Sequence, residues 1–189
     1  MYELKIIVAS TRPGRKGISV ANWFFEEVKK YRDFDAEMLD LDEIDLPFLD
    51  EPKHPKLQQY TKEHTKNWSK KIDSADAFIM VIPEYNYSAP PTLMNAIDFL
   101  YKEWNYKPAA FVSYGGLSGG MRAAQMCKQI MTTVKLVPVT EAVVIPFFEK
   151  KIDEQGNFKA DEIIRKSVET MMTELLKWTK ALQPMRQTQ

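Results

Sequence analysis

The chain has 189 residues, of which 44% are hydrophobic and 12% aromatic, a composition typical of one folded domain rather than a disordered chain. Its 26 basic and 26 acidic residues give a net charge of zero, so no overall field attracts nucleic acid or an anionic membrane. No apolar run approaches the roughly 20 residues of a membrane span, and the N-terminus shows no secretory pattern. We therefore expect one cytoplasmic domain over residues 1–189 that binds neither nucleic acid nor membrane.

Hydrophobic periodicity predicts strands that alternate with helices along the whole chain. The predicted strands are 4–9, 34–41, 77–82, 109–114 and 141–146, the last after a short strand-like piece at 136–139. The predicted helices are 18–31, 56–73, one that begins near Pro90, 121–134 and 161–182, and 42–45 is interpreted as a solvated acidic turn. This alternation predicts an α/β protein with a doubly wound, five-stranded parallel sheet in the order 2-1-3-4-5.

The same periodicity predicts which helical faces are buried. On the first helix the expected core residues are Ala21, Phe25 and Val28. On the second helix the stripe is Leu57, Tyr60, His64 and Trp68, and on the last helix it is Ile164, Val168, Met171, Leu175 and Trp178. We interpret the methionine in the last stripe as a core residue.

The single cysteine and the two histidines favour packing roles. Cys127 falls in a helical pattern with Ile130 and Met131 and has no histidine nearby in sequence, which is typical of a buried apolar thiol. His54 and His64 are ten residues apart, a spacing that matches no metal-ligand motif. We therefore expect no disulfide within the chain, no metal and no nucleophile.

The first candidate site is the loop at residues 10–17, between the first strand and the first helix. It carries two hydroxyls, three cations and two glycines directly before a helix N-terminus, whose free amides favour an anion. Its spacing matches neither the Walker P-loop nor the Gly-x-Gly-x-x-Gly fingerprint of dinucleotide-binding folds. The loop is therefore a candidate phosphate site, and a solvated basic turn is the alternative interpretation.

Two further loops have the composition of ligand sites. Residues 84–88 are polar and aromatic and follow Pro83 at the carboxyl end of the third strand, where open α/β sheets bind ligands. Turn and cap residues with surface tyrosines are the alternative there. Residues 113–120 follow the fourth strand and hold four of the seven glycines, so the backbone there can approach a flat polar ligand. In the predicted strand order these loops converge with residues 10–17 on one cleft, which suits a phosphorylated planar cofactor.

The residues that follow the third predicted strand match a recognisable motif. The stretch Pro83-Glu84-Tyr85-Asn86, with Ser88, Pro90, Leu93 and residues 95–98, resembles the signature of the NADPH-dependent FMN reductase family. Residues 10–14 are similar to that family's FMN phosphate loop, 113–116 to its second flavin loop, and 46–48 to a loop that borders the active site. Two positions depart from the pattern: Met94 stands where many members carry lysine, and Ala9 where glycine is common.

The resemblance implies a flavodoxin-like three-layer fold and an FMN-dependent oxidoreductase. NADPH would reduce the flavin, which would then reduce a small-molecule acceptor such as a flavin, a quinone, an azo compound or a metal oxyanion, in ping-pong order. The flavin carries the chemistry, so no catalytic residue is assigned. An electron carrier or flavin-sensing module of the same fold is the alternative, and the neutral charge argues mildly against a flavodoxin. A flavin-free interaction domain is a third possibility, against which the anion loop counts.

The resemblance also implies roles for individual residues. Ser10, Arg12 and the amides near Gly17 and Ile18 would hold the phosphate. The flavin ring would face Pro83, Glu84, Tyr85, Asn86, Ser113, Tyr114, Gly115 and Gly116. Arg15, Lys16 and Arg122 are weaker candidates for the phosphates of the nicotinamide cofactor. The family further implies a homodimer or homotetramer, with Trp104, Asn105 and Tyr106 as boundary residues, although a core position competes for Trp104.

Overall fold

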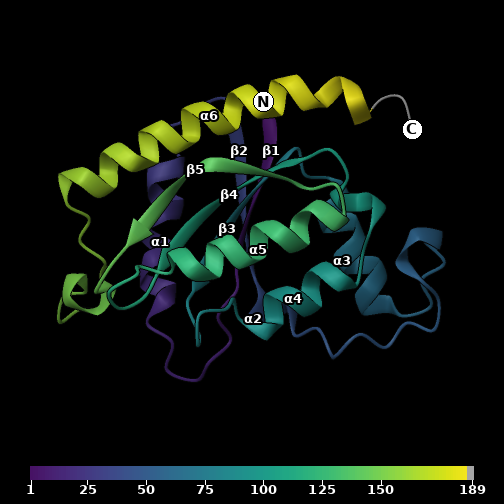
Figure 1. Ribbon diagram of the computed structural model, residues 1–189, viewed down its shortest axis with the longest axis horizontal. Helices are drawn as coiled ribbons and strands as arrows, with labels where there is room; N and C mark the ends of the chain where they lie inside the picture. The colour runs from purple at the N-terminus through teal and green to yellow at the C-terminus, as the bar shows by residue number, and fades with distance from the viewer. Residues whose placement is uncertain (187–189) are drawn as a thin grey trace.

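The computed structural model of the protein describes residues 1–186 and is built on a five-stranded sheet. All neighbouring strands are parallel, in the predicted order β2-β1-β3-β4-β5 (Figure 1). The strands are β1 (Tyr2–Val8), β2 (Phe34–Asp40), β3 (Ala77–Pro83), β4 (Pro108–Tyr114) and β5 (Val137–Ile145). Every residue of β3 and β4 is buried, as expected for central strands that helices cover on both faces.

Helices cover both faces of the sheet and make three layers (Figure 1). Helices α1 (Gly17–Val28) and α6 (Glu162–Arg186) pack on one face, and α3 (Glu63–Asp73), α4 (Pro91–Asp98) and α5 (Met121–Thr133) on the other. The short elements are α2 (Leu41–Ile44), η1 (Pro55–Leu57), η2 (Lys102–Trp104) and η3 (Phe148–Lys151). Across residues 1–186, none of the helices is both long and apolar enough to cross a membrane.

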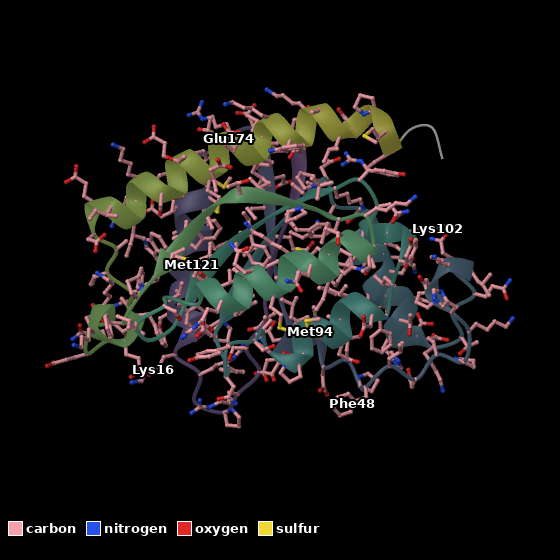
Figure 2. All side chains as sticks on the ribbon, in the orientation of Figure 1. Lys16, Phe48, Met94, Lys102, Met121 and Glu174 are labelled. Carbon is pink, nitrogen blue, oxygen red and sulfur yellow. The ribbon has the colours of Figure 1, made fainter. Side chains whose placement is uncertain are left out.

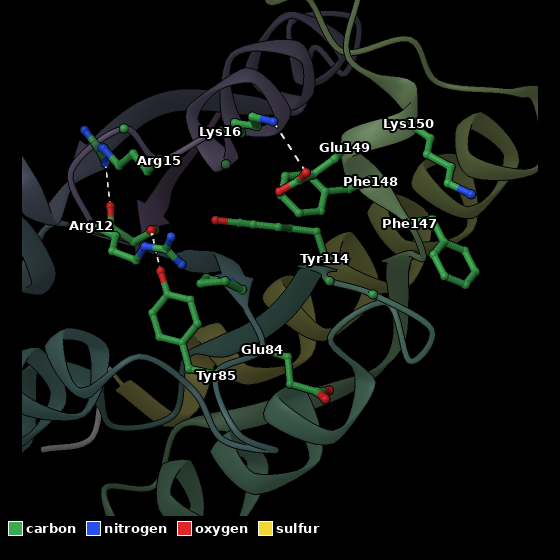
Figure 3. Close-up of a pocket in the computed structure, with 16 residues that line it drawn as sticks. Arg12, Arg15, Lys16, Glu84, Tyr85, Tyr114, Phe147, Phe148, Glu149 and Lys150 are labelled. Atoms are coloured by element: carbon green, nitrogen blue, oxygen red, sulfur yellow. Dashed lines mark hydrogen bonds and ion pairs between the residues drawn. The ribbon is translucent and has the colours of Figure 1, made fainter.

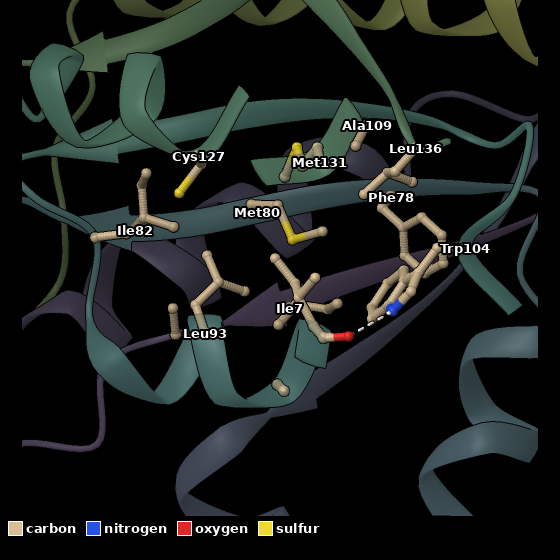
Figure 4. Packing of buried hydrophobic residues seen from close by; sticks show 14 of the residues in the cluster. Ile7, Phe78, Met80, Ile82, Leu93, Trp104, Ala109, Cys127, Met131 and Leu136 are labelled. Atoms are coloured by element: carbon tan, nitrogen blue, oxygen red, sulfur yellow. Dashed lines mark hydrogen bonds between the residues drawn. The ribbon is translucent and has the colours of Figure 1, made fainter. Parts of the chain in front are cut away.

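Successive strand residues supply two separate cores, because side chains alternate between the faces of a strand. Ile6 and Val8 contribute to the core under α1 and α6, whereas Ile7 contributes to the core under α3, α4 and α5. In the second core Cys127 is fully buried, and burial raises the pKa of its thiol to about 12 (Figure 4). The thiol is therefore protonated at neutral pH, and the predicted packing role is confirmed.

The structure differs from the sequence prediction for one helix and for one loop. Residues 56–73 do not form one helix, because the Glu51 carboxylate accepts hydrogen bonds from the amides of Thr61 and Lys62 and α3 starts only at residue 63. The stripe predicted from Leu57 to Trp68 is therefore interrupted. The acidic stretch predicted as a turn forms the short α2, since the carboxylate of Asp40 caps it by accepting from the amide of Asp42 at 3.1 Å.

The last predicted strand is longer than expected. β5 runs unbroken from residue 137 and includes most of the piece predicted separately, because a bulge absorbs the irregularity. Its register shifts between Ala109 and Phe111 of β4, which pair with Pro138 and Ala142. The bulge keeps Thr140 and Glu141, which lie between Pro138 and Ala142, within one strand.

In each of two predicted helical stripes, one predicted core residue is replaced by its neighbour in sequence. Phe24 is fully buried in α1 whereas Phe25 is only partly buried, and in α6 Thr179 is buried whereas Trp178 is 41% exposed. The remaining residues of the stripe on α6, Ile164, Val168, Met171 and Leu175, are buried as predicted. A period of 3.6 residues leaves such one-residue choices open until the partner surface is known.

Candidate functional site

A cavity of about 680 Å³ opens at the carboxyl ends of the strands (Figure 3). Its walls come from the loops after β1, β3 and β4 and from the segment after β5. The lining residues are Ser10, Arg12, Gly14, Arg15, Lys16, Gly17, Pro83, Glu84, Tyr85, Tyr114, Gly115, Gly116, Phe147, Phe148, Glu149 and Lys150. The three loops predicted to converge do so, at the switch point between β1 and β3 where doubly wound sheets bind ligands.

The loop after β1 presents an uncapped helix end to this cavity. Helix α1 begins at Gly17, the side chain of its N-cap residue Lys16 makes no capping hydrogen bond, and its first turn has no acidic residue. Free amides at the positive end of a helix dipole favour an anion. Arg12 is exposed and lines the cavity beside this helix end, and Lys16 reaches toward Glu149 at 3.4 Å.

Arg15 holds the same loop in place. Its guanidinium donates to both carboxylate oxygens of Asp40 and to the carbonyl of Ser10, each at 2.6 Å. The hydrogen bonds to Asp40 raise the pKa of Arg15 above its ordinary value, so the guanidinium stays positively charged. Because these contacts use the planar fork of the guanidinium, Arg15 is a structural residue of the loop and is less available to an external phosphate.

Tyr114 extends from the end of β4 across the cavity toward the start of α1 (Figure 3). A Cβ atom added to Gly17 would lie 1.8 Å from the Tyr114 hydroxyl, so only glycine leaves room for this ring. The ring packs on Phe148 with centroids 4.7 Å apart. Within the described residues the buried hydroxyl has no hydrogen-bond partner of normal geometry, and burial raises the pKa of Tyr114. The hydroxyl is therefore a neutral donor that faces a helix N-terminus.

The loop after β3 folds into a tight two-residue turn. Tyr85 and Ser88 exchange backbone hydrogen bonds of 2.9 Å, and Asn86 and Tyr87 between them have φ angles of 51° and 70°. Asparagine tolerates this left-handed conformation, which is strained for tyrosine. The Tyr85 hydroxyl shares a hydrogen bond of 2.9 Å with the Ser10 hydroxyl. The turn is thus joined to the loop after β1.

The carboxylate of Glu84 contacts the loop after β4. It accepts hydrogen bonds from the Ser118 hydroxyl at 2.8 Å and from Nε of Arg122 at 2.7 Å. Burial opposes its charge, but the bonds from Arg122 and Ser118 outweigh burial and hold the pKa of Glu84 below its usual value. Arg122, a sequence candidate for the nicotinamide phosphates, is therefore already engaged in an ion pair.

The segment after β5 forms a wall that the sequence analysis did not identify. Phe147, Phe148, Glu149 and Lys150 line the cavity opposite the turn at residues 85–88 (Figure 3). Phe147 has a φ of 48°, an unusual angle for an aromatic residue. The signal in the sequence was the aromatic pair and the charged residues directly after an apolar strand, at the same edge of the sheet as the other loops.

Three predicted residues lie beside the cavity and not among its lining residues. Ile18 packs against the core under α1, and Asn86 is an exposed turn residue. Ser113 is fully buried in β4, and its hydroxyl has no hydrogen-bond partner among residues 1–186. The other nine predicted residues, Ser10, Arg12, Gly17, Pro83, Glu84, Tyr85, Tyr114, Gly115 and Gly116, line the cavity.

Trp104 is a core residue and not part of a subunit boundary. Its side chain is fully buried, and its indole N–H donates to the carbonyl of Ile97 at 3.1 Å (Figure 4). Asn105 is also buried. Tyr106 is partly exposed and is the one member of the predicted set whose side chain reaches the surface.

The loop at residues 46–48 does not line the cavity. The side chain of Asn95 accepts from the amide of Leu49 at 3.0 Å and donates to the carbonyl of Pro47 at 2.7 Å. This clamp leaves Phe48 87% exposed (Figure 2). Met94, where many members of the family carry lysine, packs partly buried against the core.

The fold and the cavity define the class of protein: a flavodoxin-like α/β protein with a cavity at the switch point of the sheet. The sequence profile described as NADPH-dependent FMN reductase matches residues 3–150. A NAD(P)H-dependent FMN reductase of Schizosaccharomyces pombe is 40% identical over 148 residues, 76% of this chain and 74% of that protein. One from Nectria sp is 36% identical, over 78% of this chain and 76% of that protein.

A solved structure supports the same fold. The flavoenzyme NAD(P)H:(acceptor) oxidoreductase of Paracoccus denitrificans aligns with a TM-score of 0.73 and 24% identity, covering 96% of this chain and 98% of that one. The chain belongs to the NADPH-dependent FMN reductase family. It is accordingly an oxidoreductase, and FMN and NAD(P)H are its expected cofactors.

Proposed function

We propose that the chain is an NADPH-dependent FMN oxidoreductase that binds FMN in the cavity with the phosphate at the start of α1. The observation that carries this proposal is the N-terminus of α1, which has no side-chain cap and meets the cavity beside Arg12 and the buried hydroxyl of Tyr114. Among residues 1–186 this hydroxyl has no hydrogen-bond partner. An anionic group with several oxygen acceptors would satisfy the amides, the guanidinium and the hydroxyl together.

Four further lining residues fit a flat ring. Pro83 and Tyr85 line one side and Gly115 and Gly116 another, and a Cβ atom added to Gly116 would meet open space. Backbone without side chains allows the polar edge of a ring to approach the amides closely. These residues would hold the ring between the loops after β3 and β4.

When bound, FMN supplies the redox chemistry, by accepting a hydride from NADPH and giving two electrons to an acceptor. The chain's own residues bind and orient the reactants. Arg12 and the amides of α1 hold the phosphate, the Tyr114 hydroxyl donates to it, and the loops after β3 and β4 exclude water from one face of the ring. We propose ping-pong order, because NADPH and the acceptor would use the same cavity in turn.

Several relatives are named for a quinone acceptor, whereas others are named FMN reductases. Proteins of Oryza sativa, Solanum tuberosum and Arabidopsis thaliana that match this chain are named as quinone oxidoreductases, at 32–36% identity over about half of the chain or more. We extend this activity to the chain as a proposal, with flavins, azo compounds and metal oxyanions as further candidates. Assembly as a homodimer or homotetramer and a cytoplasmic location remain predictions from the sequence.

The test is to mix the FMN-loaded protein with NADPH without oxygen and to follow its visible absorbance. We expect rapid bleaching, and recovery of the colour when a quinone is added without a second protein. An electron carrier would keep its absorbance under NADPH until a separate reductase was supplied. Slow or absent bleaching at saturating NADPH would therefore contradict the enzyme proposal while leaving the fold and the FMN site intact.

A further inference from the structure

Two loops of the cavity are joined by one buried carboxylate. The side chain of Glu84 is only 7% exposed, and it accepts four contacts from the segment that begins α5. The contacts come from the Ser118 hydroxyl at 2.8 Å, from the amide of Arg122 at 3.2 Å, and from Nε and a terminal nitrogen of Arg122 at 2.7 and 2.5 Å. Both guanidinium nitrogens contact Oε1 of Glu84, and the Ser118 hydroxyl and the Arg122 amide donate to Oε2, so both carboxylate oxygens are held in place.

The same arginine returns to the loop from which Glu84 comes. The guanidinium carbon of Arg122 lies 3.8 Å from the centroid of the Tyr87 ring. Tyr87 has a φ of 70°, a left-handed conformation that is strained in a residue with a side chain and persists only where its surroundings enforce it. Glu84, Arg122 and Tyr87 therefore form a chain of contacts that starts and ends in the loop after β3.

A further contact joins the loop after β3 to α5 at the other end of the tight turn. The hydroxyl of Ser88, which ends the tight turn, donates to the sulfur of Met126 in α5 at 2.7 Å. The turn is consequently attached to α5 at both of its ends, through Glu84 and through Ser88. The two walls between which a ring would lie cannot then move independently.

The N-termini of α1 and α5 also differ because of this carboxylate. The first turn of α5 receives Glu84, which accepts from the amide of Arg122, whereas the first turn of α1 has no acidic residue. A negative charge already sits at the positive end of α5 and makes that end a poor site for a second anion. The phosphate of a ligand is thereby directed to α1.

We infer that Glu84 is a positioning residue, which together with Arg122 clamps the turn at residues 85–88 to the glycine-rich loop and so sets the gap that receives the flavin ring. This differs from the sequence prediction, in which Glu84 faces the ring itself. The part that concerns the ring rests on the proposed function; the clamp itself does not.

The first test uses the flavin-free protein and amide hydrogen exchange. Glu84→Gln removes the charge but keeps the shape, and Arg122→Lys keeps the charge but loses the fork and the stacking on Tyr87. We expect the amides of residues 85–88 and 116–122 to exchange about tenfold faster in both variants, because each loses charge-assisted hydrogen bonds. Lys177→Gln breaks the exposed pair with Glu174 on α6 and serves as the matched control, with unchanged exchange in both loops.

The second test measures affinity for FMN and for riboflavin by flavin fluorescence. Both variants should bind both ligands about tenfold more weakly, because the gap for the ring changes while the phosphate loop does not. The double variant should be no weaker than the weaker single variant, since the two residues act as one unit. If Glu84 contacted the ring directly, Arg122→Lys would instead bind both ligands nearly as well as wild type, and only variants that lack Glu84 would lose affinity.

Each outcome separates the clamp from the proposed function. Unchanged exchange in both loops of both variants would overturn the clamp, whether or not the protein binds flavin. Faster exchange in both variants, together with a wild-type protein that binds neither ligand, would uphold the clamp and contradict the proposed function. Circular dichroism checks that each variant is folded, and Tyr87→Phe, which keeps the ring on Arg122, should retain wild-type exchange.

Discussion

Two arginines in one loop have different surroundings although they lie three residues apart. Arg15 is bound to both oxygens of Asp40 and to the carbonyl of Ser10, and its side chain is 14% exposed. Arg12 is exposed at the cavity, beside the first amides of α1. The buried arginine therefore holds the shape of the loop, and the exposed one is the residue that can meet a ligand phosphate.

Replacing Arg12 by alanine should weaken the binding of FMN far more than the binding of riboflavin. A charge-assisted hydrogen bond to phosphate is lost, which corresponds to about tenfold to a hundredfold in the dissociation constant of FMN, whereas riboflavin has no phosphate to lose. Fluorescence titration with the two ligands measures both constants.

Arg32→Ala is the matched control for this substitution, because Arg32 is also an exposed arginine but lies far along the chain from the cavity lining. It should leave both constants unchanged. An equal loss of FMN and riboflavin affinity in Arg12→Ala would show that Arg12 is not a phosphate ligand.

At the scale of single elements, α3 starts directly after two residues whose amides are bound by the carboxylate of Glu51. Both oxygens of Glu51 accept from the backbone and hydroxyl of Thr61 and from the amide of Lys62, at 2.8–3.0 Å. Burial opposes the charge, but the amides of Lys62 and Thr61 prevail and lower the pKa of Glu51 to about 2. A group whose pKa is lowered on folding stabilises the folded state while it is ionised in both states.

Glu51→Gln should therefore destabilise the protein in a pH-dependent way. The stabilising contribution of Glu51 is fully present above about pH 4.5 and is lost as the pH falls through about 2. At pH 7 we expect the variant to lose about 1 kcal/mol of unfolding free energy, the usual size of a capping contribution at a solvent-screened site. Urea unfolding at pH 7 and at successively lower pH measures the difference, which should shrink below about pH 4.5.

Glu154→Gln removes a similar exposed carboxylate elsewhere and should leave the unfolding free energy nearly unchanged at every pH. A difference between wild type and Glu51→Gln that stayed constant down to pH 3 would contradict the lowered pKa. The start of α3 would then depend on packing and not on this carboxylate.

At the scale of the whole molecule, four segments line one cavity at a single edge of the sheet. The parallel order places the ends of β1, β3, β4 and β5 at that edge, so each following segment contributes a wall. The enclosed volume is about 680 Å³, within the range of single-ligand sites. With a flavin in place, a nicotinamide and an acceptor would have to use the remaining space one after the other.

Steady-state kinetics should consequently show ping-pong order. Double-reciprocal plots of rate against NADPH concentration, at several fixed concentrations of a small quinone, should be parallel. Oxidised nicotinamide product should compete with the quinone, because both would bind the reduced enzyme. Intersecting lines would mean that both substrates bind together, and the shared cavity would then not be the site of both half-reactions.

Much of the architecture could be predicted from local sequence. Apolar runs such as residues 77–82 and the 3.6-residue periodicity of the helices depend on burial along a strand or helix, so they indicate the order of elements and the parallel sheet. The short α2 was missed although its cap, from the carboxylate of Asp40 to the amide of Asp42, is local in sequence. The predicted start of the second helix was wrong because a side chain from elsewhere intervenes, as Glu51 does at Thr61. Such contacts join residues that no short window of sequence places together.

Local sequence was enough to predict the fold class and the three loops that meet at the cavity, because periodicity, glycine content and the positions of prolines act locally. What each side chain does in the cavity depends on the tertiary structure. It engaged Arg15 with Asp40, turned Glu84 toward Arg122, buried Trp104 and added the wall at residues 147–150. The physical reason is that a charged or aromatic side chain takes the partner that folding brings within a few ångströms, and that partner is set by the packing of the whole sheet and its helices.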